Sequence, residues 1–255
     1  MSSRSPDFKC PNCGTAVVPK VAERLVDGMW TGKPVFILGG GPSLGNHLKQ
    51  LGELADYGRV IATNRAIELP VEIDMWCWVD DRVFRHVSNG RFGPDIQRKF
   101  YLYDGIYVTR TVASRTVEYP DYVIRIKSNP GNELGESFGS YVNTHSNIGF
   151  FALNMAYLLG ADPIILLGYD QRGDLNDRNQ WWHDGYPGEP NKSASRAYTV
   201  MRGGFLNAAN KMKAEGRRLW NASPGSTLDF IENIDTLNEV FARLQTEPIL
   251  IEQRG

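Results

Sequence analysis

The sequence predicts an α/β fold, a single domain with a doubly wound, mostly parallel sheet and helices on both faces of that sheet. Short apolar runs of strand length alternate along the chain with longer segments of helical periodicity, a pattern typical of repeated βα units. Polar residues directly follow several of the apolar runs, at the strand ends where such sheets bind ligands. A chain of 255 residues is long enough to bury one large core of this kind.

The composition is that of an ordinary globular protein, with 42% hydrophobic residues, 22% charged residues and a formal net charge of −1. This balance gives no electrostatic footprint for binding duplex nucleic acid, so bulk nucleic acid is not an expected partner. No apolar run is long enough to span a membrane, and the first residues do not resemble a signal peptide. We therefore expect a cytoplasmic protein, and the sequence leaves its oligomeric state open.

Residues 1–28 are predicted to form an N-terminal extension that precedes the main domain, residues 29–255. Cys10 and Cys13 have the spacing of one knuckle of a zinc ribbon. A structural zinc ion needs four ligands, and the only other cysteine, Cys77, stands alone inside a predicted strand. Two alternatives remain for the knuckle, a turn without metal or a zinc site that distant or partner ligands complete.

The first strand of the main domain is predicted at residues 35–38, and it enters a turn of three glycines. Glycine allows the backbone to approach a ligand closely, and Ser43 is expected to cap the helix that follows. Unpaired N–H groups at such a helix start favour anions, although an ordinary tight βα turn explains the same residues. The candidate phosphate-binding residues are Gly39, Gly40, Gly41, Pro42 and Ser43.

The remaining elements are predicted in order from hydrophobic periodicity and from their Gly, Pro and Asn boundaries. Short apolar runs indicate strands, and apolar residues spaced three or four apart indicate amphipathic helices. The expected strands cover 58–64, 73–79, 99–103, 122–126, 163–170 and 218–221, and the expected helices cover 21–26, 44–57, 148–159, 195–215 and 237–244.

Acidic residues end two of these strands. Asp80 and Asp81 follow the strand at 73–79, and paired carboxylates at such a place can hold Mg²⁺ on a diphosphate. The alternative is that one of them caps the next helix while the other faces water. Asp170 ends the strand that follows the buried helix at 148–159, either as a catalytic residue, as a neighbour of a nucleotide or in a structural role.

Four segments together resemble one broad superfamily: Gly39-Gly-Gly-Pro-Ser-Leu44, Ala62-Thr-Asn-Arg65, the unit from Gly149 to Asp170, and Ser223-Pro-Gly-Ser226. The superfamily includes bacterial lipooligosaccharide sialyltransferases, flagellin-modifying motility accessory factors and the 6-hydroxymethylpterin diphosphokinase-like (DUF115) domains. The resemblance covers residues 33–232 and implies a Rossmann-like nucleotide-binding transferase. It does not choose the reaction, since members move either a sugar or a diphosphate.

In the sialyltransferases the glycine turn holds the phosphate of the sugar nucleotide, and this chain has Gly40 where the family has Asn. The resemblance also implies nucleotide contacts from the end of the second strand, from the loop before the apolar helix and from the turn after the last strand. The matching positions are Asn64, Ser146, Asn147, Gly149, Ser223, Pro224, Gly225 and Ser226.

A loop histidine acts as general base in the sialyltransferases, and His183 is the nearest equivalent, although it lies further from the C-terminal turn than in the family. Imidazole suits the role because its usual pKa is near 6.5. A solvated loop histidine is the alternative. His145 is a competing candidate at a helix start, expected to be a ligand contact or a neighbour of the helix cap rather than a base. His47 and His86 are expected at the surface. The neighbouring Trp181-Trp182 pair suits either a stacking platform or a lid on the core.

Three functions follow as alternatives. The favoured one is a glycosyltransferase that uses a nucleotide sugar, with a cytidine monophosphate-linked donor as one candidate and an unidentified acceptor; His183 would deprotonate the acceptor hydroxyl, and the glycine turn would stabilise the leaving phosphate. The second is a diphosphokinase that transfers diphosphate from ATP, with Mg²⁺ held by Asp80, Asp81 or Asp170. The third is a nucleotide-binding module without catalytic activity.

Overall fold

The computed structural model describes residues 8–9, 16–17, 25–111, 118–145, 147–172, 181–186 and 195–247. Cys10, Cys13 and Ser146 lie outside the described residues, as does most of the helix expected at 21–26, so the predictions made for them stay predictions. Near the N-terminus, β1 (Phe8–Lys9) pairs with β2 (Ala16–Val17) in antiparallel fashion.

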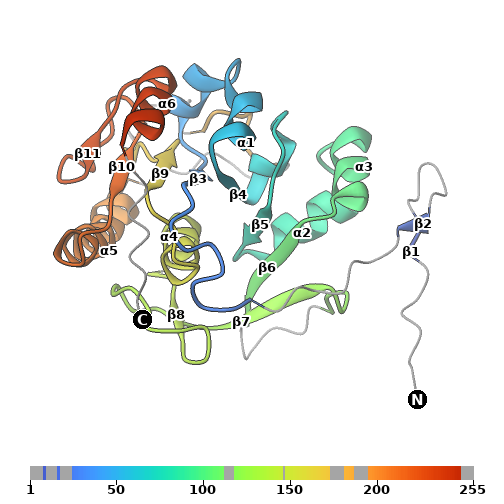
Figure 1. The fold of residues 1–255 in the computed structure, drawn as a ribbon. Coiled ribbons are helices and arrows are strands. Elements are labelled where there is room, and N and C mark those ends of the chain that lie inside the picture. Colours follow the sequence, from blue (N-terminus) through green and yellow to red (C-terminus); the bar gives the residue numbers. More distant parts are fainter. Residues whose placement is uncertain are drawn as a thin grey trace.

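Nine strands in the described ranges form one sheet, and all of their pairings are parallel. Across the sheet their order is β11-β10-β9-β3-β4-β5-β6-β7-β8. The chain therefore runs outward from β3 to β8 and then returns to place β9 on the other side of β3 (Figure 1). The strands are β3 (Val35–Leu38), β4 (Arg59–Thr63), β5 (Met75–Trp78), β6 (Ile106–Thr111), β7 (Val123–Asn129), β8 (Val142–Asn143), β9 (Ile164–Leu167), β10 (Leu219–Asn221) and β11 (Glu232–Asn233).

Helices cover both faces of the sheet, which confirms the predicted α/β class (Figure 1). Successive side chains of β3 point to opposite faces. Phe36 belongs to the core cluster that contains residues of α1, α2, α3 and α6, and Ile37 belongs to the cluster that contains residues of α4 and α5. The helices are η1 (Pro42–His47), η2 (Leu51–Glu53), α1 (Leu54–Tyr57), η3 (Asn64–Glu68), α2 (Asp81–Ser88), α3 (Pro94–Leu102), α4 (Ile148–Leu158), α5 (Ser195–Ala214) and α6 (Leu237–Thr246), where η marks a 3₁₀ helix. None of those seen in the described ranges has the length and apolar character needed to cross a bilayer.

Two of the predicted elements are wrong. Residues 99–103 were expected as a strand but lie at the end of α3, which Pro94 begins at its first turn. The strand in this region is instead β6, a few residues further along the chain. The single helix expected over 44–57 is divided into η1, η2 and α1, because Gly45 and Gly52 weaken a continuous α-helix.

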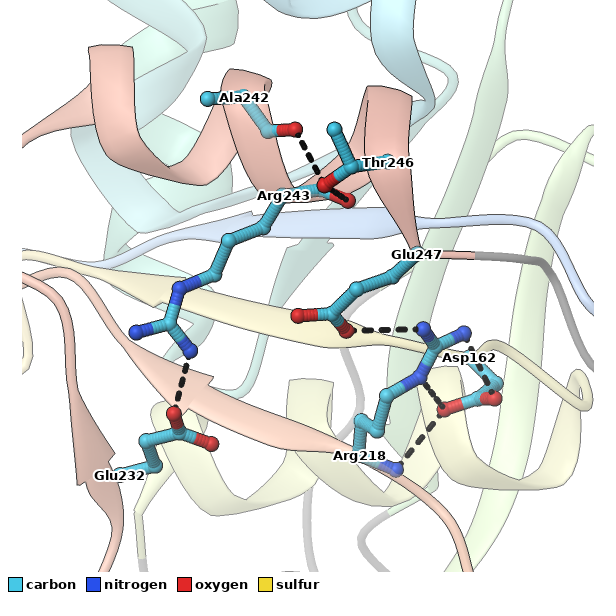
Figure 2. Close-up of polar contacts among 7 residues, drawn as sticks. All are labelled: Asp162, Arg218, Glu232, Ala242, Arg243, Thr246 and Glu247. Carbon is cyan, nitrogen blue, oxygen red and sulfur yellow. Dashed lines mark hydrogen bonds and ion pairs between the residues drawn. The ribbon is translucent and has the colours of Figure 1, made fainter.

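Ion pairs join the elements formed by the C-terminal part of the chain, namely β9, β10, β11 and α6 (Figure 2). Arg218, just before β10, donates to Asp162 through its backbone N–H at 2.8 Å and through Nη2 at 3.1 Å. The same guanidinium reaches Glu247, at the end of α6, at 3.3 Å. The Arg218 and Asp162 side chains are only 19% and 11% exposed, so the pair fixes β9 against β10 and α6.

Candidate functional site

A cavity of about 310 Å³ lies at the carboxyl ends of β3, β4 and β9. This is the point where the chain reverses its direction across the sheet, the place where open α/β sheets bind ligands. Its floor consists of residues 39–41 and 168–172, its walls come from η3 and the start of α4, and residues 181–186 and α5 close it. Of the predicted site residues, the lining contains Gly39, Gly40, Gly41, Asn64, Asn147, Gly149, Asp170 and His183.

The glycine turn is bound tightly to the end of β9. Gly39 N–H donates to Leu167 O at 2.7 Å, and Gly41 N–H donates to Gly168 O at 2.8 Å. The residue that caps η1 is Gly41 rather than Ser43, which lies inside the 3₁₀ helix. The Gly39 and Gly41 amides are therefore already used to hold the floor of the cavity together, and phosphate binding by this turn stays a prediction.

Asp170 is the carboxylate that closes this turn. It is 2% exposed and accepts a hydrogen bond from the Ser43 hydroxyl at 2.7 Å, and the Ser43 N–H approaches its two oxygens at 3.2 and 3.3 Å. Burial raises the pKa of Asp170, an effect that the Ser43 hydrogen bonds and the Arg172 guanidinium oppose. Asp170 thus positions the glycine turn, and its catalytic role stays a prediction.

Three residues of the cavity lining each have a buried polar side-chain atom without a hydrogen-bond partner among the described residues: Asn64 Oδ1, Gln171 Oε1 and Trp182 Nε1. Each unpaired buried group of this kind costs about 1–3 kcal/mol. Asn64 and Gln171 also have positive backbone φ angles of 47° and 49°, which residues other than glycine adopt less often. Backbone strain and unpaired atoms in one cavity indicate a site built for a polar ligand.

His183 lies in an aromatic and basic environment on the loop that closes the cavity. Its ring stacks on Trp181 with centroids 5.6 Å apart and planes at 10°. Its Nδ1 accepts the Gly185 N–H at 3.0 Å and lies 3.2 Å from Arg65 Nη1. Burial and the positive charge of Arg65 lower the pKa of His183 to about 3, so the ring is neutral at neutral pH.

We expect His183 to make the protein acid-sensitive. Its folded-state pKa of about 3 lies below the usual value of 6.5, so the unfolded chain binds a proton first as the pH falls. The stabilising contribution is complete above pH 6.5 and declines toward pH 3, by up to about 1.4 kcal/mol per pH unit. In urea unfolding at several pH values, the free energy of unfolding should decline more steeply with falling pH for the wild type than for His183→Gln. Equal slopes for the two proteins would contradict this assignment.

Asn147 and Gly149 have local structural tasks beside their place in the cavity lining. The Asn147 side chain caps α4 by accepting the Gly149 N–H at 2.6 Å, and its Nδ2 donates to Met201 Sδ at 3.0 Å. Gly149 leaves room for Tyr169, whose ring carbon Cε1 would lie 2.8 Å from an added Cβ. The roles of both residues in nucleotide binding stay predictions.

The turn at Ser223–Ser226 lies behind the cavity floor and is not part of the lining. Ser223 Oγ accepts the Tyr169 N–H at 2.8 Å, and the Ser226 hydroxyl donates to Tyr169 O at 2.6 Å. The Arg172 guanidinium packs against Gly225, 3.0 Å from the position of an added Cβ. The turn therefore supports the floor from below, and a direct nucleotide contact from it stays a prediction.

Asp80 and Asp81 lie outside the cavity lining. Asp80 caps α2 by accepting the Arg82 N–H at 3.0 Å and pairs with the Arg82 guanidinium at 2.5 Å. Asp81 is 6% exposed and accepts from the Tyr119 hydroxyl at 2.6 Å, so it does not face water. Within the part of the chain that the structure describes, no three His, Cys, Asp or Glu side chains gather as metal ligands would.

His47 and His86 differ from expectation, whereas His145 lies two residues before Asn147, the cap of α4. His47 and His86 were predicted at the surface, but they are 3% and 9% exposed. His47 Nε2 lies 2.9 Å from Ala222 O, and burial lowers the pKa of this ring; His86 packs beside Phe92. His145 bonds Val200 O of α5 at 2.8 Å and is not among the lining residues.

Several lining residues were not predicted: Arg65, Gln171, Arg172, Tyr186, Tyr198 and Met201. Arg65, Gln171 and Arg172 follow predicted strand-end residues by one or two positions, so a wider window at each strand end would have found them. Tyr198 and Met201 reach the cavity from α5, and no local signal in the sequence marks them.

The model of the family described as 6-hydroxymethylpterin diphosphokinase MptE-like matches residues 11–172, well over half of the chain. The chain belongs to the MptE-like family. The match ends at Arg172, the last residue of the cavity floor, so this MptE-like chain adds its loop at 181–186 and α5 beyond the matched segment. No curated protein matches the sequence.

Among solved structures, the MAf glycosyltransferase from Magnetospirillum magneticum AMB-1 is similar with a TM-score of 0.56 and 11% identity. The similarity covers 88% of this chain but only 36% of that protein, so the MptE-like chain spans about a third of its length. The sialyltransferase CstII from Campylobacter jejuni, in complex with CMP-3FNeuAc, gives a TM-score of 0.48 at 17% identity over 81% of this chain and 88% of that one. The family match confirms the resemblance to the MptE-like family, and the similarity to the MAf structure confirms the shared fold.

Proposed function

We propose that this MptE-like protein is a nucleotide-dependent group transferase, and more specifically a glycosyltransferase that uses a nucleotide sugar. The cavity carries this proposal, because three of its lining residues each have a buried polar atom without a partner among the described residues. Asn64 Oδ1 and Gln171 Oε1 are acceptors, so they suit a ligand rich in N–H and O–H donors, as nucleobase amines and sugar hydroxyls are. The Trp181 ring offers a face on which a base or sugar can stack.

The charges of the lining are compatible with a phosphate between these groups. Arg172 is 54% exposed, and its guanidinium lies 3.8 Å from the carboxylate of the buried Asp170, so much of this cation remains available. Arg65 adds a second guanidinium, although Glu68 already pairs with it. A cavity of about 310 Å³ lies at the lower end of the range for small-molecule sites.

Diphosphate transfer from ATP is the second candidate, and the description of the matched family favours it. That reaction needs carboxylates that hold Mg²⁺ on the phosphates. Among the described residues, Asp170 is the only carboxylate in the lining, and Ser43 already donates to both of its oxygens. The described lining is therefore better suited to a donor that is not held through carboxylate-bound Mg²⁺.

A thermal-shift panel of CMP, UDP, GDP and ATP, each with and without Mg²⁺, tests the proposal. A ligand at 100 times its Kd stabilises the folded state by about 2.7 kcal/mol. We expect stabilisation by a nucleotide that needs no metal, followed by turnover of the matching nucleotide sugar. Stabilisation only by ATP in the presence of Mg²⁺ would favour the diphosphokinase instead. No stabilisation by any of the four nucleotides would overturn the proposal.

Substituting Gln171 separates binding from stability. Gln171→Gly removes an unpaired buried oxygen and relieves a positive φ, so the empty protein should gain about 1 kcal/mol in free energy of unfolding. The same change should weaken nucleotide binding about tenfold, because a ligand contact is lost. Gln245→Ala, on α6 and away from the lining, is the control. Stronger or unchanged binding by Gln171→Gly would contradict a ligand contact from this side chain.

A further inference from the structure

Two hydrogen-bond donors face the same ring nitrogen of His183. The Gly185 backbone N–H donates to Nδ1 at 3.0 Å. Arg65 Nη1, which can only donate hydrogen bonds, lies 3.2 Å from the same Nδ1. A nitrogen that accepts from a backbone N–H carries no proton itself. The proton of the neutral ring is therefore on Nε2, and no described residue accepts a hydrogen bond from that atom.

Arg65 is held firmly in this position. Its Nε and Nη2 both donate to the Glu68 carboxylate, and the two side chains are only 13% and 11% exposed. Its Nη1 also donates to Gly185 O, and its guanidinium lies 4.6 Å from the centre of the Phe92 ring. A planar guanidinium with this many partners does not rotate away without breaking several contacts at once. The arginine therefore fixes both the loop and the tautomer of His183.

The same loop lies against the glycine turn. Trp182 N–H donates to Gly40 O at 3.1 Å. Trp182 also lines the cavity, and its indole N–H is buried without a partner among the described residues. Trp182 and His183 are thus two neighbouring lining residues of one loop, and each has a side-chain N–H without an acceptor among the described residues. Arg172, whose guanidinium is half exposed, lines the same cavity, and N–H donors combined with such a cation suit an anionic oxygen.

We propose that Arg65 and the Gly185 amide hold His183 as a neutral imidazole with its proton on Nε2, and that Nε2–H donates to a phosphate oxygen of the bound nucleotide. This inference rests on the proposed function for the identity of the ligand. It assigns Arg65 as a positioning residue and His183 as a hydrogen-bond donor, in place of the general base that the family resemblance implies.

The role of general base is opposed by the geometry. For Nε2 to accept a proton from a hydroxyl, the ring must first move its own proton to Nδ1, where it would meet the Gly185 N–H and the Arg65 guanidinium. The other charged and titratable groups around the ring are Glu68, which Arg65 neutralises, and Asp184 and Tyr186 on its own loop. None of the described contacts places an acceptor beside Nδ1 for a second proton.

The tautomer is measurable without any ligand or activity. Protein labelled with ¹⁵N-histidine, compared with His183→Gln to assign the signals, should show a protonated Nε2 and an unprotonated Nδ1 from about pH 5 to pH 8. Arg65→Met should allow both tautomers and raise the pKa of the ring. Arg59→Met removes an exposed arginine at the opposite end of β4 and should change neither. A proton on Nδ1 in the wild type at neutral pH would overturn the proposal.

The phosphate contact is tested with matched probes. CMP and cytidine, or the nucleotide and nucleoside pair that responds in the panel above, are titrated against the wild type, His183→Gln and His183→Phe. We expect His183→Phe to weaken CMP binding about tenfold or more, with little effect on cytidine binding. His183→Gln keeps an N–H donor, so its affinity for CMP should be much closer to that of the wild type.

Two other results have distinct meanings. If both variants bind CMP like the wild type but lose turnover equally, His183 is a base and the proposal fails. If no nucleotide binds to the wild type, the proposed function and the phosphate contact both fail, and the tautomer measurement still decides whether Arg65 fixes the ring.

Discussion

Gly41→Ala is expected to lower the free energy of unfolding by about 3 kcal/mol and to abolish nucleotide binding. The added Cβ would lie 2.7 Å from Gly168 O and 2.8 Å from Asp170 Cγ, distances that force the turn away from β9. Backbone strain does not contribute, because Gly41 has φ −71° and ψ 155°, which alanine adopts freely. Urea unfolding and the nucleotide titration measure the two effects.

The adjacent glycine provides the matched control for this prediction. A Cβ at Gly40 would have Trp181 Cδ1 as its nearest neighbour, at 3.5 Å, which is an ordinary van der Waals contact. The free energy of unfolding of Gly40→Ala should therefore lie within about 0.5 kcal/mol of the wild-type value. If the two substitutions cost the same, the close packing of Gly41 on the β9 end is not what holds the turn.

Asp170→Ala should cost about 3 kcal/mol in the free energy of unfolding, and Asp170→Asn should cost about 1 kcal/mol. Alanine leaves the buried N–H and hydroxyl of Ser43 without an acceptor, whereas asparagine keeps one carbonyl oxygen for them and removes a buried charge. Because Asp170 is assigned to positioning the turn, Asp170→Asn should also retain nucleotide binding. Denaturant titrations of both variants, with binding measured in parallel, provide the test.

A double-mutant cycle adds a second check on this interpretation. If Asp170 closes the turn by packing under Gly41, the cost of Gly41→Ala should be smaller in the Asp170→Ala background, because one of the two close contacts has been removed. Strict additivity, or loss of all binding in Asp170→Asn without loss of stability, would instead favour a direct role of the carboxylate in the reaction.

Much of the fold was predictable because the deciding signals are local. The apolar runs that form β3, α4 and β9 are continuous in the sequence, and each ends at a glycine or a polar residue that marks its boundary. Where local signals conflict, the prediction failed. Residues 99–103 contain aromatic residues that favour strands, yet the glycine and proline that start α3 determine their structure.

The chemistry of the site was less predictable because it depends on contacts between distant segments. Ser43 was predicted as a helix cap, but its partner is Asp170, 127 positions away. The tautomer of His183 depends on Arg65, 118 positions away, which no motif connects to the loop. The sequence marked His183 as a candidate for proton chemistry, and only the placed Gly185 amide and Arg65 guanidinium show that its Nδ1 already accepts a hydrogen bond.

The strand order also determines when the site can exist during synthesis. The strands from β3 to β8 can pair in the order in which they are translated, but β3 acquires its second neighbour only when β9 has left the ribosome. The cavity floor needs Asp170 beneath a turn made 127 residues earlier, so it closes after most of the sheet has already formed. A nascent chain arrested before β9 would therefore hold a partial sheet without the floor of the cavity.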